Sequence, residues 1–306
     1  MSKHVAVLMG GWSAERDVSL RSGKACADAL DKVGGYKISR VDVDRDIAAT
    51  LRALKPDAAL NVLHGRPGED GTLQGMLEVL GIPYSHSGVL ASALAMQKDL
   101  AKTVLKAAQV PVPGGRMATR AEAAKAHVLP RPYVIKPVAE GSSVGVFIVR
   151  EDMKHPPQEL TRADWKYGDL IMVEPFIAGK ELTCTVIGDK ATGVIEIVPA
   201  TKFYDYEAKY APGGSKHILP AQIPRAATDE AMELAVAAHR ALGCRGVTRT
   251  DFRYDDTGPK HRMILLETNT QPGMTPTSLV PEQAAYLGIS YAKLCRWMVE
   301  DASCDR

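Results

Sequence analysis

The 306-residue sequence lacks the marks of membrane, secreted and nucleic-acid-binding proteins. No apolar run approaches the roughly 18 residues that a membrane span needs, and the N-terminal strand is too short for a signal-peptide core. The five cysteines are odd in number and widely spaced, with no CxxC pair, so we expect reduced thiols in a cytoplasmic protein and no zinc site or disulfide framework. A net charge of +2 without a basic stripe gives no case for a nucleic-acid partner. What remains is a soluble globular protein of two or three domains, with no membrane partner.

The dinucleotide fingerprint is also missing. Residues 4–9 predict a buried strand that ends at two glycines, but the third glycine of G-x-G-x-x-G is absent, which disfavours a dehydrogenase. We expect Ser13 to cap a helix that runs to Val33. Strands and helices then alternate over residues 36–43, 47–54, 58–63 and 72–80, which predicts a parallel sheet with sites at the carboxyl ends of its strands. Two loops fall there and carry Glu15 and His64. Each residue also has an ordinary explanation, as a first-turn acid favoured by the helix dipole and as a satisfied loop histidine.

The most informative stretch runs from Arg249 to Asn269. Two apolar and β-branched runs flank a turn-rich linker, which predicts a β-hairpin. Side-chain alternation puts Arg249 and Asp251 on one face of the first strand, and Glu267 and Asn269 on one face of the second. If the strands pair, two carboxylates and an amide oxygen converge beside a guanidinium, and such hard oxygens suit Mg²⁺. The alternative is a set of solvated charges on an open face, but the apolar run 263–266 indicates a buried strand.

Several other segments have features of a phosphate or nucleotide site. Lys136 ends a predicted strand and precedes a Gly/Ser loop, residues 138–146, that can fold over phosphates; it is not a P-loop, and a simple glycine turn is the alternative. The strand 170–177 returns through a connector whose backbone could bond an adenine edge and whose Glu181 could bond ribose, although it could also be a domain crossover. Residues 201–210, aromatic and charged without a period, predict a lid loop. Further helices are expected over residues 92–108, 229–242 and 289–300.

Taken in order, these segments resemble the D-alanine–D-alanine ligase family of the ATP-grasp superfamily. The resemblance spans about residues 4 to 300 and rests on the motifs GGWSAERDVSL, HGRPGEDGTLQG, SGVLASALAMQK, KPVAEGSSVGV, EPFIAGKE, FYDYEAKY, RTDF and LETNTQPGMTPTSLVP. It implies an α/β ATP-grasp fold with an N-terminal open parallel-sheet domain for the first substrate (1–95), a small central domain with the glycine-rich loop (96–182) and a C-terminal catalytic domain with the metal site and lid (183–306). It also implies a cytoplasmic homodimer.

The resemblance also implies a role for each matching residue. The residues implied to bind ATP are Lys98, Lys136, Glu174, Phe176, Ile177, Glu181, Lys209 and Leu266. Those implied to hold two Mg²⁺, or Mn²⁺ in their place, are Asp251, Glu267 and Asn269. The implied catalytic groups are Glu15, Ser142, Tyr210, Arg249, Gly273 and Ser278, and those in contact with the D-alanine substrates are Glu15, His64, Arg249, Ser278 and Leu279. One departure is Gln97, which stands where the family usually has Asp.

The implied reaction is ATP-dependent formation of D-alanyl-D-alanine, a peptidoglycan precursor, through an acyl phosphate, with release of ADP and phosphate. A ligase that takes D-lactate or D-serine as its second substrate would lack the lid tyrosine, whereas Tyr210 is present. A non-catalytic ATP-binding regulator would be expected to have lost a metal ligand or the oxyanion arginine, and neither is lost. The handedness of the substrate and the dimer rest on the resemblance alone.

Overall fold

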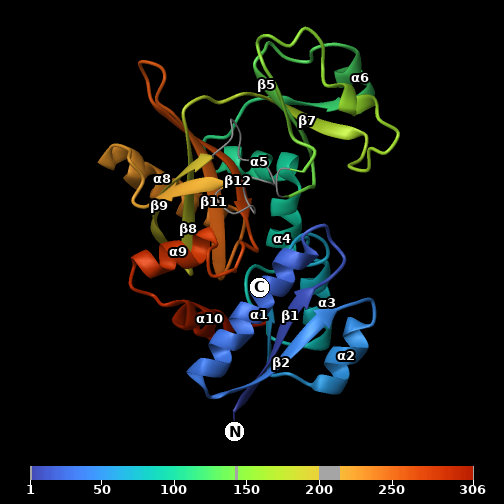
Figure 1. Ribbon diagram of the computed structural model, residues 1–306, viewed down its shortest axis with the longest axis vertical. Coiled ribbons are helices and arrows are strands. Elements are labelled where there is room, and N and C mark those ends of the chain that lie inside the picture. Colours follow the sequence, from blue (N-terminus) through green and yellow to red (C-terminus); the bar gives the residue numbers. More distant parts are fainter. Residues whose placement is uncertain (1, 142–143, 200–213, 306) are drawn as a thin grey trace.

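The computed structural model describes residues 2–141, 144–199 and 214–305, and these form three sheets (Figure 1). The N-terminal sheet is parallel, as expected, with the strand order β2-β1-β3. It consists of β1 (Lys3–Gly10), β2 (Tyr36–Val43) and β3 (Ala58–Asn61), and β3 ends two residues before the position expected from the sequence.

Helices cover both faces of this parallel sheet. Helix α1 (Arg16–Val33) packs on the face that carries Val5 and Val7, together with the C-terminal helix α10 (Tyr291–Glu300). Helices α2 (Ile47–Leu54) and α3 (Thr72–Leu80) cover the opposite face. Because both faces are covered, β1 is buried along almost its whole length, which explains its continuous apolar sequence.

The start of α1 differs from the sequence-based expectation. Glu15 occupies the N-cap position, and Ser13 does not cap the helix. Instead, the Ser13 hydroxyl accepts a hydrogen bond from the Glu15 N–H at 3.1 Å and donates one to the His64 carbonyl at 2.6 Å. Ser13 therefore joins the loop that carries Glu15 to the loop that carries His64.

A helical connector leads to the central sheet. The single helix expected over residues 92–108 is in fact two, α4 (Val89–Met96) and α5 (Lys98–Ala107). The break lies at Gln97, whose backbone is extended and whose side chain makes no capping hydrogen bond. An Asp at this position would be a good N-cap, so its replacement by Gln removes a helix cap but leaves Lys98 at the helix start.

The central sheet is antiparallel, with the order β4-β7-β5-β6. Its strands are β4 (Arg116–Thr119), β7 (Leu170–Pro175), β5 (Tyr133–Pro137) and β6 (Phe147–Val149). Helix α6 (Arg120–Lys125) and the short 3₁₀ helix η1 (Gln158–Thr161) cover it, and their apolar residues join a separate small core. This unit forms the upper lobe in Figure 1.

The third sheet carries the predicted hairpin, in the order β10-β9-β8-β11-β12. Its strands are β8 (Lys180–Ile187), β9 (Lys190–Pro199), β10 (Ser215–Ile218), β11 (Val247–Asp255) and β12 (Arg262–Asn269). The expected division after residue 182 runs through β8. Helix α8 (Arg225–Ala241), which begins four residues earlier than expected, packs its alanines on one face.

The C-terminal segment returns to the N-terminal sheet. After β12, helix α9 (Leu279–Tyr286) packs near β9, and α10 begins at Tyr291, two residues later than expected, and lies beside α1. Val247, Met274 and Leu294 share one core with Val5 and Val7, so the first and third sheets are joined by a continuous apolar interior. Among the described helices, none is both long enough and apolar enough to cross a bilayer.

Candidate active site

The hairpin of β11 and β12 has the pairing that the sequence predicts. Arg249 lies opposite Asn269, and Asp251 lies opposite Glu267. The Arg249 guanidinium donates to both oxygens of Asp251, at 2.9 and 2.8 Å. Asn269 Nδ2 and Thr183 Oγ1 also donate to this carboxylate, at 3.0 and 2.7 Å. The expected metal ligands and the expected oxyanion arginine therefore share one face of the sheet.

A β-bulge at Leu266 sets the direction of Glu267. The pairing passes from Asp251 opposite Glu267 to Phe252 opposite Leu265, which leaves Leu266 as an extra residue in β12. Leu265 faces the apolar core, so strict alternation from it would turn Glu267 to the core as well. The extra residue reverses this and places Glu267 on the side of Asp251. The Leu266 side chain is half-buried beside this site.

The expected metal ligands are two carboxylates and one amide. Among the described residues, no group of three His, Cys, Asp or Glu side chains is arranged to hold a metal ion. Asp251 and Glu267 nevertheless face each other across the strands, and their side chains are 13% and 27% exposed. A few carboxylate oxygens with room for water and phosphate oxygens are what Mg²⁺ requires, so the donor set fits this ion.

Lysines from two elements meet this carboxylate face. Lys98 Nζ, at the start of α5, donates to the Glu140 carbonyl at 2.5 Å and lies 3.4 Å from Glu267. Lys136, on β5, is buried and forms a 2.8 Å ion pair with Glu174. The pKa of Lys136 is lowered to about 8, mainly because burial disfavours the charged form; Glu267 opposes the shift, and the nearby Lys98 adds to it. The two lysines expected to bind phosphate are thus brought close to Glu267, one of the expected metal ligands.

Lys102 is a residue of this cluster that sequence reasoning missed. It lies one helical turn after Lys98, and its ammonium forms an ion pair with Glu174 inside the protein, where the two side chains are 8% and 5% exposed. Burial and the neighbouring Lys136 and Lys98 lower the pKa of Lys102. The carboxylate of Glu174, expected to bind adenine, therefore contacts two lysines. The i, i+4 spacing from Lys98 was the signal that could have identified Lys102.

Arg253 is a second missed residue, and it organises the expected adenine and ribose segment. Its guanidinium donates to the carbonyls of Ile177 and Gly179, at 3.0 and 2.7 Å. It also lies 3.4 Å from Glu181 and 5.7 Å from the centre of the Phe176 ring. Arg253 follows Arg249 and Asp251 at the same two-residue spacing, so side-chain alternation could have identified it.

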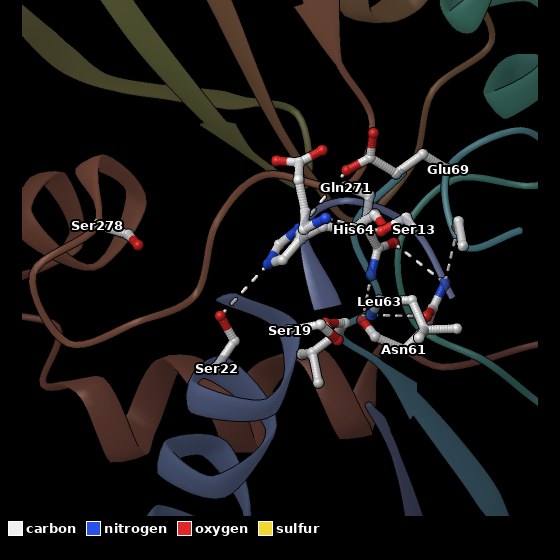
Figure 2. A network of polar contacts seen from close by, with 12 residues as sticks. Ser13, Ser19, Ser22, Asn61, Leu63, His64, Glu69, Gln271 and Ser278 are labelled. Atoms are coloured by element: carbon white, nitrogen blue, oxygen red, sulfur yellow. Dashed lines mark hydrogen bonds and ion pairs between the residues drawn. The ribbon is translucent and has the colours of Figure 1, made fainter. Parts of the chain in front are cut away.

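The residues expected to contact the amino-acid substrates line one cleft of about 320 Å³ between the N-terminal and third sheets. Its lining includes the predicted residues Glu15, His64, Arg249, Glu267, Asn269, Gly273, Ser278 and Leu279. Figure 2 shows His64 facing this space, with Ser278 on the far side. Residues separated by more than 200 positions in the sequence thus line one cleft.

His64 is held by neighbours on both ring nitrogens. Its Nε2 lies 3.3 Å from Ser22 Oγ, and its Nδ1 lies 3.5 Å from Glu69 (Figure 2). A fifth of the Glu69 side chain still meets solvent, yet desolvation and the charge of Glu15 raise the pKa of its carboxyl, while His64 opposes the shift. Gly141 of the glycine loop approaches this group closely, because a Cβ added there would lie 3.7 Å from Glu15 Oε2.

The opposite wall of the cleft is the loop that follows β12. A Cβ added to Gly273 would lie 3.1 Å from Ser278 Oγ, so glycine lets the backbone and this hydroxyl approach each other. Ser278 Oγ also accepts a hydrogen bond from the Thr275 N–H at 3.0 Å. Arg21 and His217 line the cleft too, and no sequence pattern indicated them. His217 Nδ1 lies 2.7 Å from Glu282.

Three predicted site residues lie outside the part of the chain that the structure describes. They are Ser142 in the glycine loop and Lys209 and Tyr210 in the expected lid.

Comparison with known proteins agrees with this geometry. Family models for the D-ala D-ala ligase N-terminus and C-terminus match residues 46–87 and 105–300. D-Alanine–D-alanine ligases from Azorhizobium caulinodans and Methylocella silvestris are 66% and 68% identical to this chain, and each match covers 100% of both chains.

Solved structures extend the likeness to the fold. A Bacillus anthracis D-alanine–D-alanine ligase complexed with ATP superposes with a TM-score of 0.81 at 30% identity, over 98% of this chain and 97% of that one. A D-Ala:D-Ser ligase from Enterococcus faecalis gives 0.78 at 29% identity, over 98% and 99%. The α/β architecture is therefore the ATP-grasp fold, and the chain belongs to the D-alanine–D-alanine ligase family.

Proposed function

We propose that this enzyme ligates two D-alanine molecules to D-alanyl-D-alanine at the expense of ATP, for cell-wall synthesis. The observation that carries the proposal is the single cleft lined by Glu15 and His64 on one wall and by Arg249, Gly273 and Ser278 on the other. Lys98 joins this cleft to the lysine cluster through its 3.4 Å contact with Glu267. An amino-acid site and a phosphate site therefore adjoin each other.

In the first step, the carboxylate of one D-alanine attacks the γ-phosphate of ATP to give an acyl phosphate and ADP. Glu15, which is 9% exposed, attracts the substrate ammonium and so orients the carboxylate, with His64 beside it. Lys98 and Lys136 balance the phosphate charge, which is the main requirement of phosphoryl transfer. From the sequence resemblance, Lys209 of the lid adds a third positive charge.

In the second step, the neutral amine of the other D-alanine attacks the acyl phosphate, and phosphate leaves. Ser278 and the backbone of Leu279 hold the carboxylate of this second molecule at the start of α9. Arg249 and the Gly273 N–H stabilise the negative charge that develops on the carbonyl oxygen. Water must be excluded at this stage because it would hydrolyse the acyl phosphate.

Asp251, Glu267 and Asn269 would hold the Mg²⁺ that accompanies ATP, and their opposed positions on β11 and β12 support this role. Bound Mg²⁺ neutralises phosphate charge and makes the phosphorus easier to attack. Asp251 also fixes Arg249 through two hydrogen bonds, so the metal site and the oxyanion site share a residue.

ATP would bind between the central and third sheets. The adenine and ribose would lie against Phe176, Ile177 and Glu181, and Arg253 holds this segment in place. Glu174 would also lie at the adenine, and its partners Lys102 and Lys136 would lie nearer the phosphates. This arrangement supports the division into a first-substrate unit, a glycine-loop unit and a catalytic unit, with the last boundary close to Lys180, where β8 begins.

The second substrate is D-alanine in this proposal, and D-serine is the alternative. D-Alanine–D-alanine ligases share 62–68% identity with this chain, whereas the D-Ala:D-Ser ligase shares 29%. We also propose that the protein is cytoplasmic and forms a homodimer. Analytical ultracentrifugation would test the dimer.

The deciding experiment measures phosphate and dipeptide together. The enzyme receives ATP and Mg²⁺ with D-alanine, with L-alanine, or with D-alanine plus D-serine or D-lactate, and products are identified by mass. We expect one phosphate to be released for each D-alanyl-D-alanine formed. We expect D-alanine to react and L-alanine, D-serine and D-lactate not to enter the product. ATP binding without amino-acid-dependent phosphate release would support a regulator instead. Preferential formation of D-alanyl-D-serine would identify the second substrate as D-serine.

A further inference from the structure

A pair of buried amides connects the two walls of the cleft. Gln271 Nε2 donates to the Asn61 carbonyl, and Asn61 Nδ2 donates back to Gln271 Oε1 at 3.3 Å (Figure 2). The two residues are 210 positions apart in the sequence. Asn61 is 0% exposed and Gln271 is 3% exposed, so water does not compete for these bonds.

The Asn61 side chain is fully used in this position. Its Oδ1 accepts from the Leu63 N–H at 3.1 Å, and its Nδ2 also donates to the Gly68 carbonyl at 3.0 Å. Asn61 therefore fixes both ends of the loop that presents His64 and Glu69.

Gln271 holds the opposite wall. It lies two residues after Asn269, the last expected metal ligand, and two residues before Gly273, the expected oxyanion donor. A hydrogen bond at this point fixes where the loop leaves β12. The pair thus joins the loop of the first substrate to the loop that stabilises the reacting carbonyl.

We propose that Asn61 and Gln271 are positioning residues that set the distance and orientation between the first D-alanine and the oxyanion group. The inference rests on the proposed function. Neither amide touches the reacting atoms, but the two walls must agree closely, because a misplacement of about 1 Å can cost about 10²-fold in rate. If the walls separate, the amine of the second substrate attacks more slowly and water gains access to the acyl phosphate.

Gln271→Met tests the proposal, because it keeps the volume and removes both hydrogen bonds of the pair. Gln74→Met is the matched control. Gln74 is also buried, and its Nε2 donates to the same Gly68 carbonyl at 2.7 Å, but this bond stays within the N-terminal unit. Both variants lose a buried amide, and only one loses the connection between the walls. If Gln271→Met does not fold, Gln271→Asn takes its place in the test. The shorter asparagine side chain cannot make both hydrogen bonds with Asn61.

The readout is the ratio of phosphate released to dipeptide formed, together with kcat/KM for D-alanine and the Kd for ATP. For Gln271→Met we expect a ratio clearly above that of the wild type, a loss of at least about tenfold in kcat/KM, and an unchanged Kd for ATP. Gln74→Met should keep the wild-type ratio. A purely structural role would lower the amount of active enzyme without changing the ratio.

Two results would overturn the inference. One is a Gln271 variant that stays as tightly coupled as the wild type, and the other is a Gln74→Met enzyme that is uncoupled to the same degree. A wild-type protein that makes no dipeptide would instead overturn the proposed function, and the inference with it. The wild-type ratio therefore separates the two failures.

Discussion

The affinity for ATP should fall as Lys136 loses its proton. Burial lowers the pKa of this lysine to about 8 in the free protein. The protonated fraction is then about three quarters at pH 7.5 and about a tenth at pH 9. If ATP needs the charged form, the apparent Kd rises by the ratio of these fractions, about eightfold. The direction follows from desolvation, which disfavours the ammonium until phosphate charge arrives.

Isothermal titration calorimetry would measure the Kd for ATP without D-alanine and with a metal chelator present. The chelator is needed because a cation bound at Glu267 would cancel the effect of this carboxylate on the pKa of Lys136. Repeating the titration at pH 8.5 in two buffers of different ionisation enthalpy should reveal an uptake of about 0.8 proton on ATP binding. Lys136→Arg serves as the comparison, because its guanidinium stays charged throughout. The reasoning fails if the wild-type Kd is flat from pH 7.5 to 9, or if the Arg variant shows the same rise.

Two further predictions concern stability. Lys102→Met should lower the free energy of unfolding by about 1–3 kcal/mol, because it leaves buried Glu174 with one lysine partner instead of two; urea titration beside the exposed Lys106→Met checks this, and equal midpoints would contradict it. Burial lowers the pKa of His239 from 6.5 to about 4, so the native state binds fewer protons than the unfolded state between these values. Stability should therefore fall by up to about 3 kcal/mol as the pH drops from 6.5 to 4, and His239→Gln should flatten this dependence in urea titrations; an unchanged slope would exclude His239 as the cause.

Local patterns carried much of the site. The alternation in RTDF and LETN predicted that Arg249 and Asp251 lie on one side of the first strand and Glu267 and Asn269 on one side of the second, and the pairing of β11 with β12 brings all four to the same face. The sequence did not predict the break between helices α4 and α5. The apolar spacing continues through Gln97, so only the extended backbone at this residue reveals two helices.

Contacts across the chain were beyond such patterns. Lys102 and Arg253 had weak local signals, but their partners Glu174 and Ile177 lie on other elements. Arg21 and His217 had no signal at all, because their place in the cleft depends on how three sheets pack.

The sequence by itself determined the parallel strands, the hairpin, most of the long helices and the family, because each depends on the period of side chains along a few residues or on the order of motifs. Only the tertiary structure decided which way Glu267 points, since the bulge at Leu266 exists through pairing with β11. It also decided that Asn61 meets Gln271, 210 residues away. Both outcomes depend on hydrogen bonds between segments that the packing of the three sheets brings together, and no local period encodes that packing.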